Sequence, residues 1–366
     1  MTVLHRADTV GSLLRPAYLK DARKAWMAGT LLTPEFKRVE DRAVDEAIAL
    51  QEAVGLEIVT DGEMRRLVFT GTLTEAIDGL SPTPSPTWHW HGQKPEDEMD
   101  FQLPVCVMSK IRRRRSLATE EFAYARGKTT KPLKMTLPSP LMLSLFWSPQ
   151  HSTAAYHDPF ALFADAVDIL RQEVCELAAL GCQYIQIDAP ELATLVDASQ
   201  RQGTYQARGV SPERMLGEGV EMLNAIADAP GITFGLHLCR GNNEGHWMSQ
   251  GGYEVISQQV FTRATQYDIF LLEYDDWRSG SFEPLKDVPP DKTVVLGLVS
   301  TKTNPLEPAD GLMTRIAEAS RYFPREQLAL STQCGFASVI GGNPVTEEAQ
   351  TAKLRLVVDV ARQAWG

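Results

Sequence analysis

The chain has 366 residues, of which 43% are hydrophobic and 23% are charged, and its formal net charge is −11 with a pI of about 5.2. A chain of this size and polarity folds either as two domains or as one large α/β barrel. The acidic balance argues against nucleic acid or an anionic membrane as the main partner, because both are negatively charged.

The sequence also indicates a compartment. No apolar run approaches the roughly 20 residues that a membrane-spanning helix needs, and residues 1–8 contain no apolar segment of the signal-peptide type. We therefore expect a cytoplasmic protein. The chain has five cysteines, an odd number, so metal binding or thiol chemistry is expected rather than disulfides. Cys175 and Cys182 belong to an apolar helical stretch and are expected in the core.

The N-terminal part of the chain predicts two strands and one long helix. Residues Leu4 to Ser12 predict a strand that ends in a polar turn. Between Phe36 and Val54 the apolar residues recur at helical spacing, and Gly55 follows as a left-handed cap. Leu56 to Thr60 predicts the second strand, which leads into Asp61-Gly62-Glu63.

Residues 81–131 interrupt this alternation and predict an inserted hairpin and loop over one end of the fold. The segment begins with a proline-rich stretch, which favours an extended chain. Alternating residues predict a strand over 101–108, and a short helix is predicted over 120–126. The arginines at 112–115 are interpreted as a solvated loop or a local ion-pair site rather than a functional patch.

The insertion contains the motif Trp88-His89-Trp90-His91. Two histidines that are two residues apart could serve as metal ligands. Aromatic packing in a covering loop is the simpler interpretation of the same residues.

Regular alternation returns after residue 131. Amphipathic helices are predicted over 159–180, 211–229, 312–322 and 346–364, with Ser211 as a cap before Pro212. With the insertion left out, strands are expected near residues 4, 56, 132, 184, 232, 269, 294 and 328. Eight strand–helix units favour a (β/α)8 TIM barrel, as a single domain over 1–366. A doubly wound open sheet is the alternative, but the sequence contains no dinucleotide or Walker-type glycine motif after a strand.

The residues at the predicted strand ends form a coherent set. In a barrel the chemistry lies where the strands end. His237 and Cys239 are two residues apart, so their side chains leave one strand on the same face. Glu273 follows the next strand and Cys334 the last. Two thiolates, an imidazole and a carboxylate suit Zn²⁺, and their spread over different strands favours a catalytic site.

Such a site favours a particular chemistry. A metal that already carries two thiolates activates water poorly, but it can hold a substrate thiol in its deprotonated form. A free thiol has a pKa of about 8.5 and is only slightly ionised at neutral pH. The pattern therefore predicts the transfer of an alkyl group to a thiolate.

These residues resemble the motifs of the cobalamin-independent methionine synthases, in particular their C-terminal catalytic barrel, over essentially the whole chain. Val10-Gly11-Ser12 resembles the family's Ile-Gly-Ser, and Asp61-Gly62-Glu63 resembles its His-Gly-Glu. Residues 185–190 resemble its Ile-Gln-Ile-Asp-Glu-Pro. The family's zinc ligands fall on His237, Cys239, Glu273 and Cys334.

The resemblance implies a reaction and its participants. The reaction would be methyl transfer from a 5-methyltetrahydrofolate, or another methyl donor, to homocysteine, giving methionine, with Zn²⁺ as the cofactor. Glu63 and Asp188 would hold the substrate ammonium. The turn at Gly11 and Ser12, with the Ser12 backbone N–H, would hold the carboxylate.

The sequence also departs from the family. The family's long N-terminal half has no counterpart here, and Gln333 replaces the aspartate before the last cysteine. The family's Asp-Ile-His segment reads Val299-Ser300-Thr301-Lys302 here, so the family's general-acid histidine is not in place and Lys302 is the candidate substitute. Phe146 or Trp147 is the candidate for the aromatic residue that stacks on the pterin.

Three further functions are compatible with the same residues. The epoxyalkane:coenzyme M transferases share the zinc pattern, and Arg240 could pair with a sulfonate or carboxylate there. A non-catalytic zinc- and thiol-binding barrel that acts with a partner is the second possibility. A hydrolase that uses Asp61, Glu63 and Asp188 is the third. A partner protein that delivers the methyl group is also left open.

Overall fold

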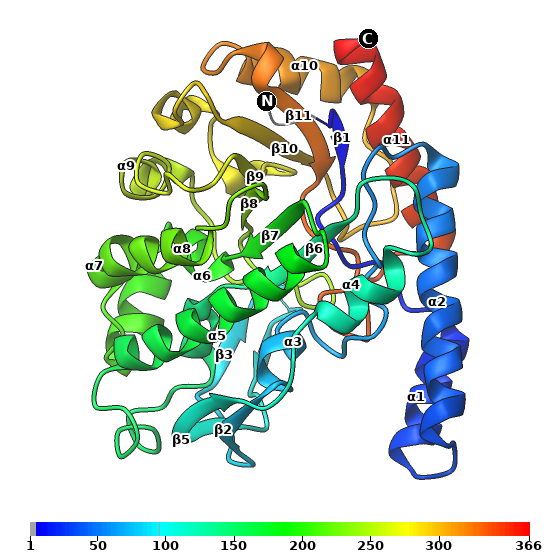
Figure 1. Ribbon diagram of the computed structural model, residues 1–366. Coiled ribbons are helices and arrows are strands. Elements are labelled where there is room, and N and C mark those ends of the chain that lie inside the picture. The colour runs from blue at the N-terminus through cyan, green and yellow to red at the C-terminus, as the bar shows by residue number, and fades with distance from the viewer. Residues whose placement is uncertain (1–4, 95) are drawn as a thin grey trace.

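The computed structural model describes residues 5–94 and 96–366, so Leu4, where the first strand is expected to begin, lies outside the described residues. Seven parallel strands form one curled sheet in the order β1-β11-β10-β9-β8-β7-β6 (Figure 1). The predicted α/β barrel fold is confirmed. The strands of this sheet are β1 (Ala7–Asp8), β6 (Lys134–Pro138), β7 (Tyr184–Asp188), β8 (Thr233–Leu238), β9 (Ile269–Glu273), β10 (Thr293–Val299) and β11 (Leu328–Thr332).

Residues 56–62 occupy the position between β1 and β6, where the barrel closes. Val59 forms a single parallel bridge with Leu133, and the Leu13 N–H donates to the Gly62 carbonyl at 3.0 Å. The strand predicted here is in the right place but is reduced to one bridge. The physical reason is the turn that follows, because the backbone enters the left-handed region at Gly62 (φ 67°) and leaves the ladder.

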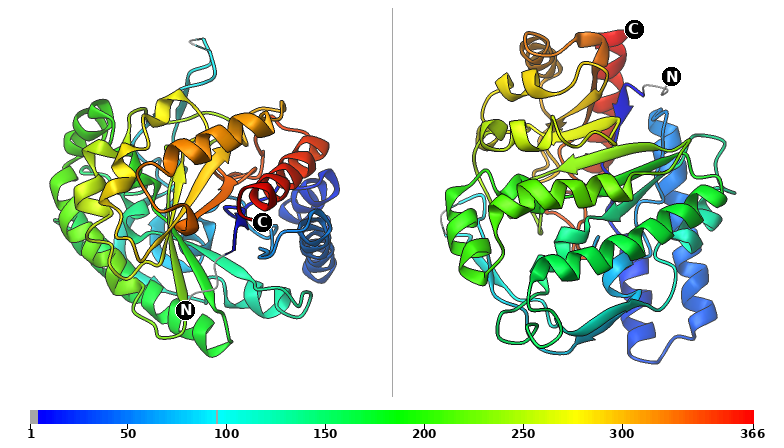
Figure 2. Two further views of the ribbon diagram at one scale, coloured as in Figure 1. Left: turned by 90° about the horizontal axis from the view of Figure 1, so that it is seen from above. Right: turned by 60° about the vertical axis from the view of Figure 1, so that its left-hand side comes forward.

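Helices pack around the sheet, as the two views of Figure 2 show. The long helices lie where the apolar spacing predicts them, and Gly55 ends α2 in the left-handed conformation with φ of 93°. The helix predicted over 211–229 is interrupted by a π-helical turn at 215–219. The helices are α1 (Ala17–Met27), α2 (Thr33–Val54), α3 (Gly71–Thr74), α4 (Thr119–Ala125), α5 (Pro159–Ala179), α6 (Pro190–Thr194), α7 (Pro212–Arg214), α8 (Val220–Ile226), α9 (Ser257–Val260), α10 (Ala309–Ala319) and α11 (Glu347–Trp365).

Two antiparallel strand pairs form in and just before the predicted insertion at 81–131. Strand β2 (Ile77–Ser81) pairs with β5 (Cys106–Arg113), and β3 (Trp88–Trp90) pairs with β4 (Met99–Phe101). The continuous strand predicted over 101–108 is wrong, because residues 102–105 separate β4 from β5. The β3–β4 hairpin, in cyan, stands out from the barrel in the left view of Figure 2.

Two predictions about charged and sulfur-containing residues are resolved by the packing of β5 and α5. Arg113 on β5 donates to Glu173 and Glu176 of α5, each at 2.6 Å, so this part of the arginine cluster is an ion-pair site. Cys182 is buried, as predicted. Cys175 is exposed, so its predicted place in the core is wrong, because it lies on the outward face of α5.

The apolar core has two parts. The larger part lies between the sheet and the helices. The smaller part fills the barrel interior and consists of Ile58, Tyr184, Ile269, Leu271, Val295 and Ala329. Because both faces of each strand are covered, the strands read as continuous apolar runs. Within the described ranges, no helix is long and apolar enough to cross a membrane.

Candidate functional site

The parallel register of the sheet brings the polar strand ends together. Asp188, the last residue of β7, lies beside His237 of β8. Glu273 ends β9, and Cys334 follows the end of β11. Since these strands are neighbours and run in the same direction, side chains from distant parts of the sequence meet at one end of the barrel.

Three of the four predicted metal ligands form a compact group. The ligand atoms of His237, Cys239 and Cys334 lie within 4.8 Å of one another, and all three residues are buried. The Nδ1 of His237 lies 3.3 Å from the Leu271 carbonyl, while its Nε2 has no hydrogen-bond partner among the described residues. An imidazole that donates from Nδ1 to a carbonyl presents Nε2 as a free ligand atom, which is the usual arrangement of a metal-binding histidine.

The two thiols of this group have opposite pKa shifts. A hydrogen bond from Cys239 and the neighbouring His237 lower the pKa of Cys334 well below its ordinary value, although burial opposes this. The same hydrogen bond, together with burial, raises the pKa of Cys239 well above its ordinary value. Two buried thiolates side by side repel each other, so the pair ionises fully only when a cation lies between the sulfurs.

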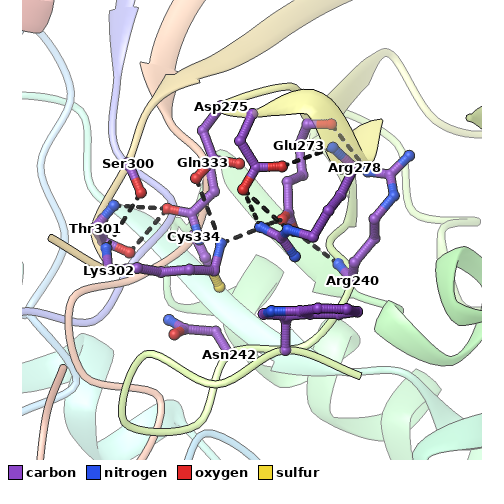
Figure 3. A network of polar contacts seen from close by, with 12 residues as sticks. Arg240, Asn242, Glu273, Asp275, Arg278, Ser300, Thr301, Lys302, Gln333 and Cys334 are labelled. Atoms are coloured by element: carbon purple, nitrogen blue, oxygen red, sulfur yellow. Dashed lines mark hydrogen bonds and ion pairs between the residues drawn. The ribbon is translucent and has the colours of Figure 1, made fainter. Parts of the chain in front are cut away.

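The fourth predicted ligand, Glu273, is not part of this group. Its Oε2 accepts the Arg240 backbone N–H at 2.7 Å, and its Oε1 lies 3.2 Å from Lys302 and 3.5 Å from Arg278 (Figure 3). Burial alone would raise its pKa, but the charges of Lys302, Arg278 and Arg240 outweigh it and lower the pKa to about 2. In this structure Glu273 is therefore an ionised carboxylate held by cations, and it lies apart from the three-residue group.

Lys302, the predicted general acid, lies behind Glu273 in the same network. Its Nζ contacts Glu273 at 3.2 Å and Asp275 at 3.4 Å, and the residue is buried. Burial lowers the pKa of Lys302, but these two carboxylates outweigh it and leave the pKa above its ordinary value. Lys302 is not among the residues that line the pocket described next.

A pocket opens beside the three metal-ligand candidates. It contains about 700 Å³ of empty space, part of which is continuous with solvent. Three predicted substrate-binding residues line it together with the thiols and the imidazole: Ser12, Glu63 and Asp188. The predicted substrate and metal residues therefore share one cavity.

Glu63 and Asp188 are buried acids of this pocket with partly free oxygens. Glu63 has a positive φ of 54°, and its Oε1 accepts from Thr136 at 2.7 Å and pairs with Arg66 at 3.3 Å. Within 5–94 and 96–366, its Oε2 has no hydrogen-bond partner. Burial raises the pKa of Asp188 to about 7, although His237 opposes the shift. Both acids are suited to receive a cationic group, which would replace the solvent that burial has removed.

Gly11 supports the pocket without lining it. A Cβ at this position would lie 3.0 Å from a Glu63 carboxylate oxygen, so the glycine leaves room for that side chain. Ser12 does line the pocket, and its carbonyl accepts the Phe336 N–H at 2.8 Å. The predicted turn is thus present, but Gly11 acts through Glu63.

Another acid of the pocket escapes prediction from the sequence. Glu191 lies on α6, and its carboxylate accepts a hydrogen bond from Ser139 while Oε2 has no partner. Burial raises the pKa of Glu191 to about 8. Its only sequence signal is its position three residues after Asp188. The wall around Glu191 is mainly apolar or aromatic and includes Trp90, Met142, Leu145, Tyr205 and Met248.

Three further sequence candidates, Phe146, Trp147 and Arg240, do not line the pocket. Phe146 and Trp147 are buried but do not line the pocket, whereas Trp90 from the β3–β4 hairpin does. Arg240 is fully buried, with its guanidinium 4.2 Å from the Tyr253 ring, and it donates to the Gly251 carbonyl at 2.9 Å. Its guanidinium is therefore unavailable for the substrate anion that a coenzyme M transferase would have to bind.

Comparisons with known proteins identify relatives of this chain. Residues 6–363 match the family described as cobalamin-independent synthase, catalytic domain. The protein YxjG of Bacillus subtilis (strain 168) is 36% identical, with 98% of this chain and 94% of YxjG covered. A methionine synthase of Saccharolobus solfataricus is 23% identical over 89% of this chain and 86% of its own length. The crystal structure of a putative vitamin-B12-independent methionine synthase from Listeria monocytogenes superposes with a TM-score of 0.74, at 26% identity and with 100% and 99% of the two chains covered.

Proposed function

This chain belongs to the cobalamin-independent methionine synthase family, a family of methyltransferases, and from that premise we propose that it transfers a methyl group to the thiol of homocysteine, giving methionine. The observation that carries the proposal is the shared cavity. One pocket combines two thiols and an imidazole with the acids Glu63 and Asp188. A thiol-bearing amino acid needs both sets of groups at once.

The donor atoms at the barrel end fit Zn²⁺. His237 offers an unpartnered Nε2, and Cys239 and Cys334 offer sulfurs within 4.8 Å of it. Three protein ligands leave one position of a tetrahedral ion for a substrate sulfur. Zn²⁺ bound there would supply a thiolate nucleophile at neutral pH. The Glu273 carboxylate would have to move away from Lys302 to serve as a fourth ligand. In its present position, its negative charge is balanced by Lys302, Arg278 and Arg240.

The rest of the pocket fits the amino-acid part of homocysteine. A substrate ammonium between Glu63 and Asp188 would favour the ionised form of Asp188, because it would offset the burial that raises the pKa of Asp188 to about 7 against the opposing effect of His237. The turn at Ser12 lies on the same cavity and offers its hydroxyl and backbone to the carboxylate. These contacts orient the substrate so that its sulfur points to the thiol and imidazole group.

The apolar wall around Trp90 and Tyr205 is the proposed place of the methyl donor, with a 5-methyltetrahydrofolate as the first candidate. A folate that loses its methyl group must gain a proton on the departing nitrogen. Glu191 is protonated at neutral pH and lines this wall, whereas Lys302 contacts Glu273 and Asp275. We therefore assign the proton to Glu191 and a positioning role to Lys302.

The test is a donor screen on the zinc-loaded protein. Homocysteine is incubated with 5-methyltetrahydrofolate, its polyglutamate form or methylcobalamin, and methionine is measured by mass spectrometry. We expect methionine with at least one donor and loss of the product after chelation. Zinc and homocysteine binding without transfer from any donor would contradict the proposal and favour the non-catalytic barrel that acts with a partner. Alkylation of coenzyme M by an epoxide would instead identify a coenzyme M transferase, and hydrolysis that survives chelation would identify a hydrolase.

A further inference from the structure

A second group of potential metal ligands lies on the β3–β4 hairpin, outside the pocket. In this hairpin His89 of β3 lies directly opposite Asp100 of β4. His91 follows β3, and Glu98 precedes β4. Because the histidines are two residues apart on an extended chain, their rings leave on the same face and lie 4.8 Å apart.

Each histidine of this hairpin faces a carboxylate. The Nε2 of His89 lies 2.7 Å from one Glu98 oxygen, and the Nδ1 of His91 lies 3.3 Å from the other. The ligand atoms of His89, His91 and Glu98 all lie within 4.8 Å of one another. The Nδ1 of His89 lies 2.8 Å from Asp100.

The contact with Asp100 distinguishes this group from an ordinary surface ion pair. A histidine that binds a metal usually gives its second ring N–H to a carboxylate, which fixes the tautomer and directs the other nitrogen to the ion. Asp100 does this for His89. We propose that His89, His91 and Glu98 bind a divalent first-row metal ion, with Zn²⁺ as the best match to two imidazoles and a carboxylate. The side chains are 30–46% exposed, so water completes the coordination.

The position of this hairpin metal site gives the ion a structural consequence. His91 and Trp247 exchange two backbone hydrogen bonds, at 2.8 and 2.9 Å, and their rings lie 4.5 Å apart. Trp247 belongs to the segment that follows Cys239, and Trp90 of the same hairpin lines the pocket. An ion at His89, His91 and Glu98 therefore ties β3 to β4 and holds the hairpin against the segment that leads away from the thiol site.

Cobalt(II) titration of the metal-free, untagged chain separates the two sites. Ions bound by thiolates give an intense sulfur-to-cobalt charge-transfer band, whereas an imidazole and carboxylate site gives only weak visible bands. We expect two ions per chain, with the second ion producing no further charge-transfer absorption. His89→Gln should weaken binding of the second ion at least tenfold and leave the charge-transfer band unchanged, and Asp100→Asn should weaken it by about 10–100-fold.

The matched control is His157→Ala, which removes an exposed histidine outside the hairpin. It should bind both ions like the wild type. The proposal is overturned if the wild-type chain binds one ion only, or if His89→Gln and His157→Ala bind the second ion equally. Either result would mean that the hairpin contacts are imidazolium–carboxylate ion pairs.

Discussion

The barrel end and the β3–β4 hairpin each place three potential metal ligands within 4.8 Å, yet their surroundings differ in kind. At the barrel end, His237, Cys239 and Cys334 are buried, and the imidazole Nε2 has no partner. On the hairpin, His89 and His91 are partly exposed and already face carboxylates. The buried group has an unpaired imidazole nitrogen and two adjacent thiols that a cation would satisfy. On the hairpin, a metal ion must displace the protons that the histidines share with their carboxylate partners.

The largest expected effect comes from breaking the buried group. Cys239→Ser removes a sulfur ligand, so zinc affinity and methyl transfer should each fall by more than the roughly 100-fold that follows loss of an outer partner. Bound zinc is measured by elemental analysis and methionine by mass spectrometry. Cys175→Ser is the matched control, because that thiol is exposed and lies on α5. If Cys239→Ser kept its zinc at the thiol site, the buried group would not be the metal site proposed for the barrel end.

The next effect tests the network behind the buried group. Lys302→Met leaves the carboxylates of Glu273 and Asp275 with one cation fewer in a buried place, so the free energy of unfolding should fall by about 3–5 kcal/mol. The double variant Lys302→Met/Asp275→Asn should recover part of this loss in chemical denaturation. If Lys302→Met instead kept its stability while losing the alkaline limb of the pH–rate profile, Lys302 would be the proton donor.

A smaller effect concerns pH. Burial raises the folded-state pKa of Glu191 to about 8, whereas an unfolded glutamate titrates near about 4.3. Between these values the folded state binds the extra proton, so stability is greatest at acid pH and declines as the pH rises toward 8. Glu191→Gln should lessen this decline by on the order of 1–4 kcal/mol between pH 5 and 8. Thermal unfolding curves recorded at several pH values measure this pH dependence. If stability fell equally with pH in the wild type and in Glu191→Gln, the raised pKa of Glu191 would be refuted.

The smallest effect is expected on the hairpin. When only the thiol site is loaded with metal, His91→Gln removes one partly exposed partner of Glu98, and such ion pairs contribute at most about 1 kcal/mol. Methyl transfer should change by less than about fivefold, mainly in KM, because the thiol group itself is untouched. Steady-state kinetics test this. A loss as large as that of Cys239→Ser would mean that the hairpin belongs to the catalytic centre and that the two regions are not independent.

The sequence predicts the barrel and part of the site for separate physical reasons. Apolar runs such as those of β10 and β11 are buried on both faces, so their limits are visible in the sequence. His237 and Cys239 are recognisable because their spacing places them on one strand face, and Cys334 because it follows the last strand. The π-helical turn at 215–219 has no comparable signal.

The features that the sequence does not predict depend on the direction in which individual side chains point in the folded protein. Glu273 ends its strand as expected, but whether it faces the thiols or Lys302 depends on Arg240 and Arg278, which arrive from other segments. Glu191 becomes a pocket acid only because Ser139, from a different strand end, holds it inside. The hairpin register that sets Asp100 against His89 is likewise a property of the folded chain.

The single bridge at Val59, where the barrel closes between β1 and β6, has a consequence for ligand binding. This seam carries Glu63 on the turn at its end, so an amino acid held by Glu63 and Asp188 would link the seam to β7 across the end of β6. Substrate would then tie this weakly paired segment to the well-paired strands of the sheet. Amide hydrogens at 56–62 should exchange with deuterium fastest among the barrel positions in the free protein, and slow most when homocysteine binds.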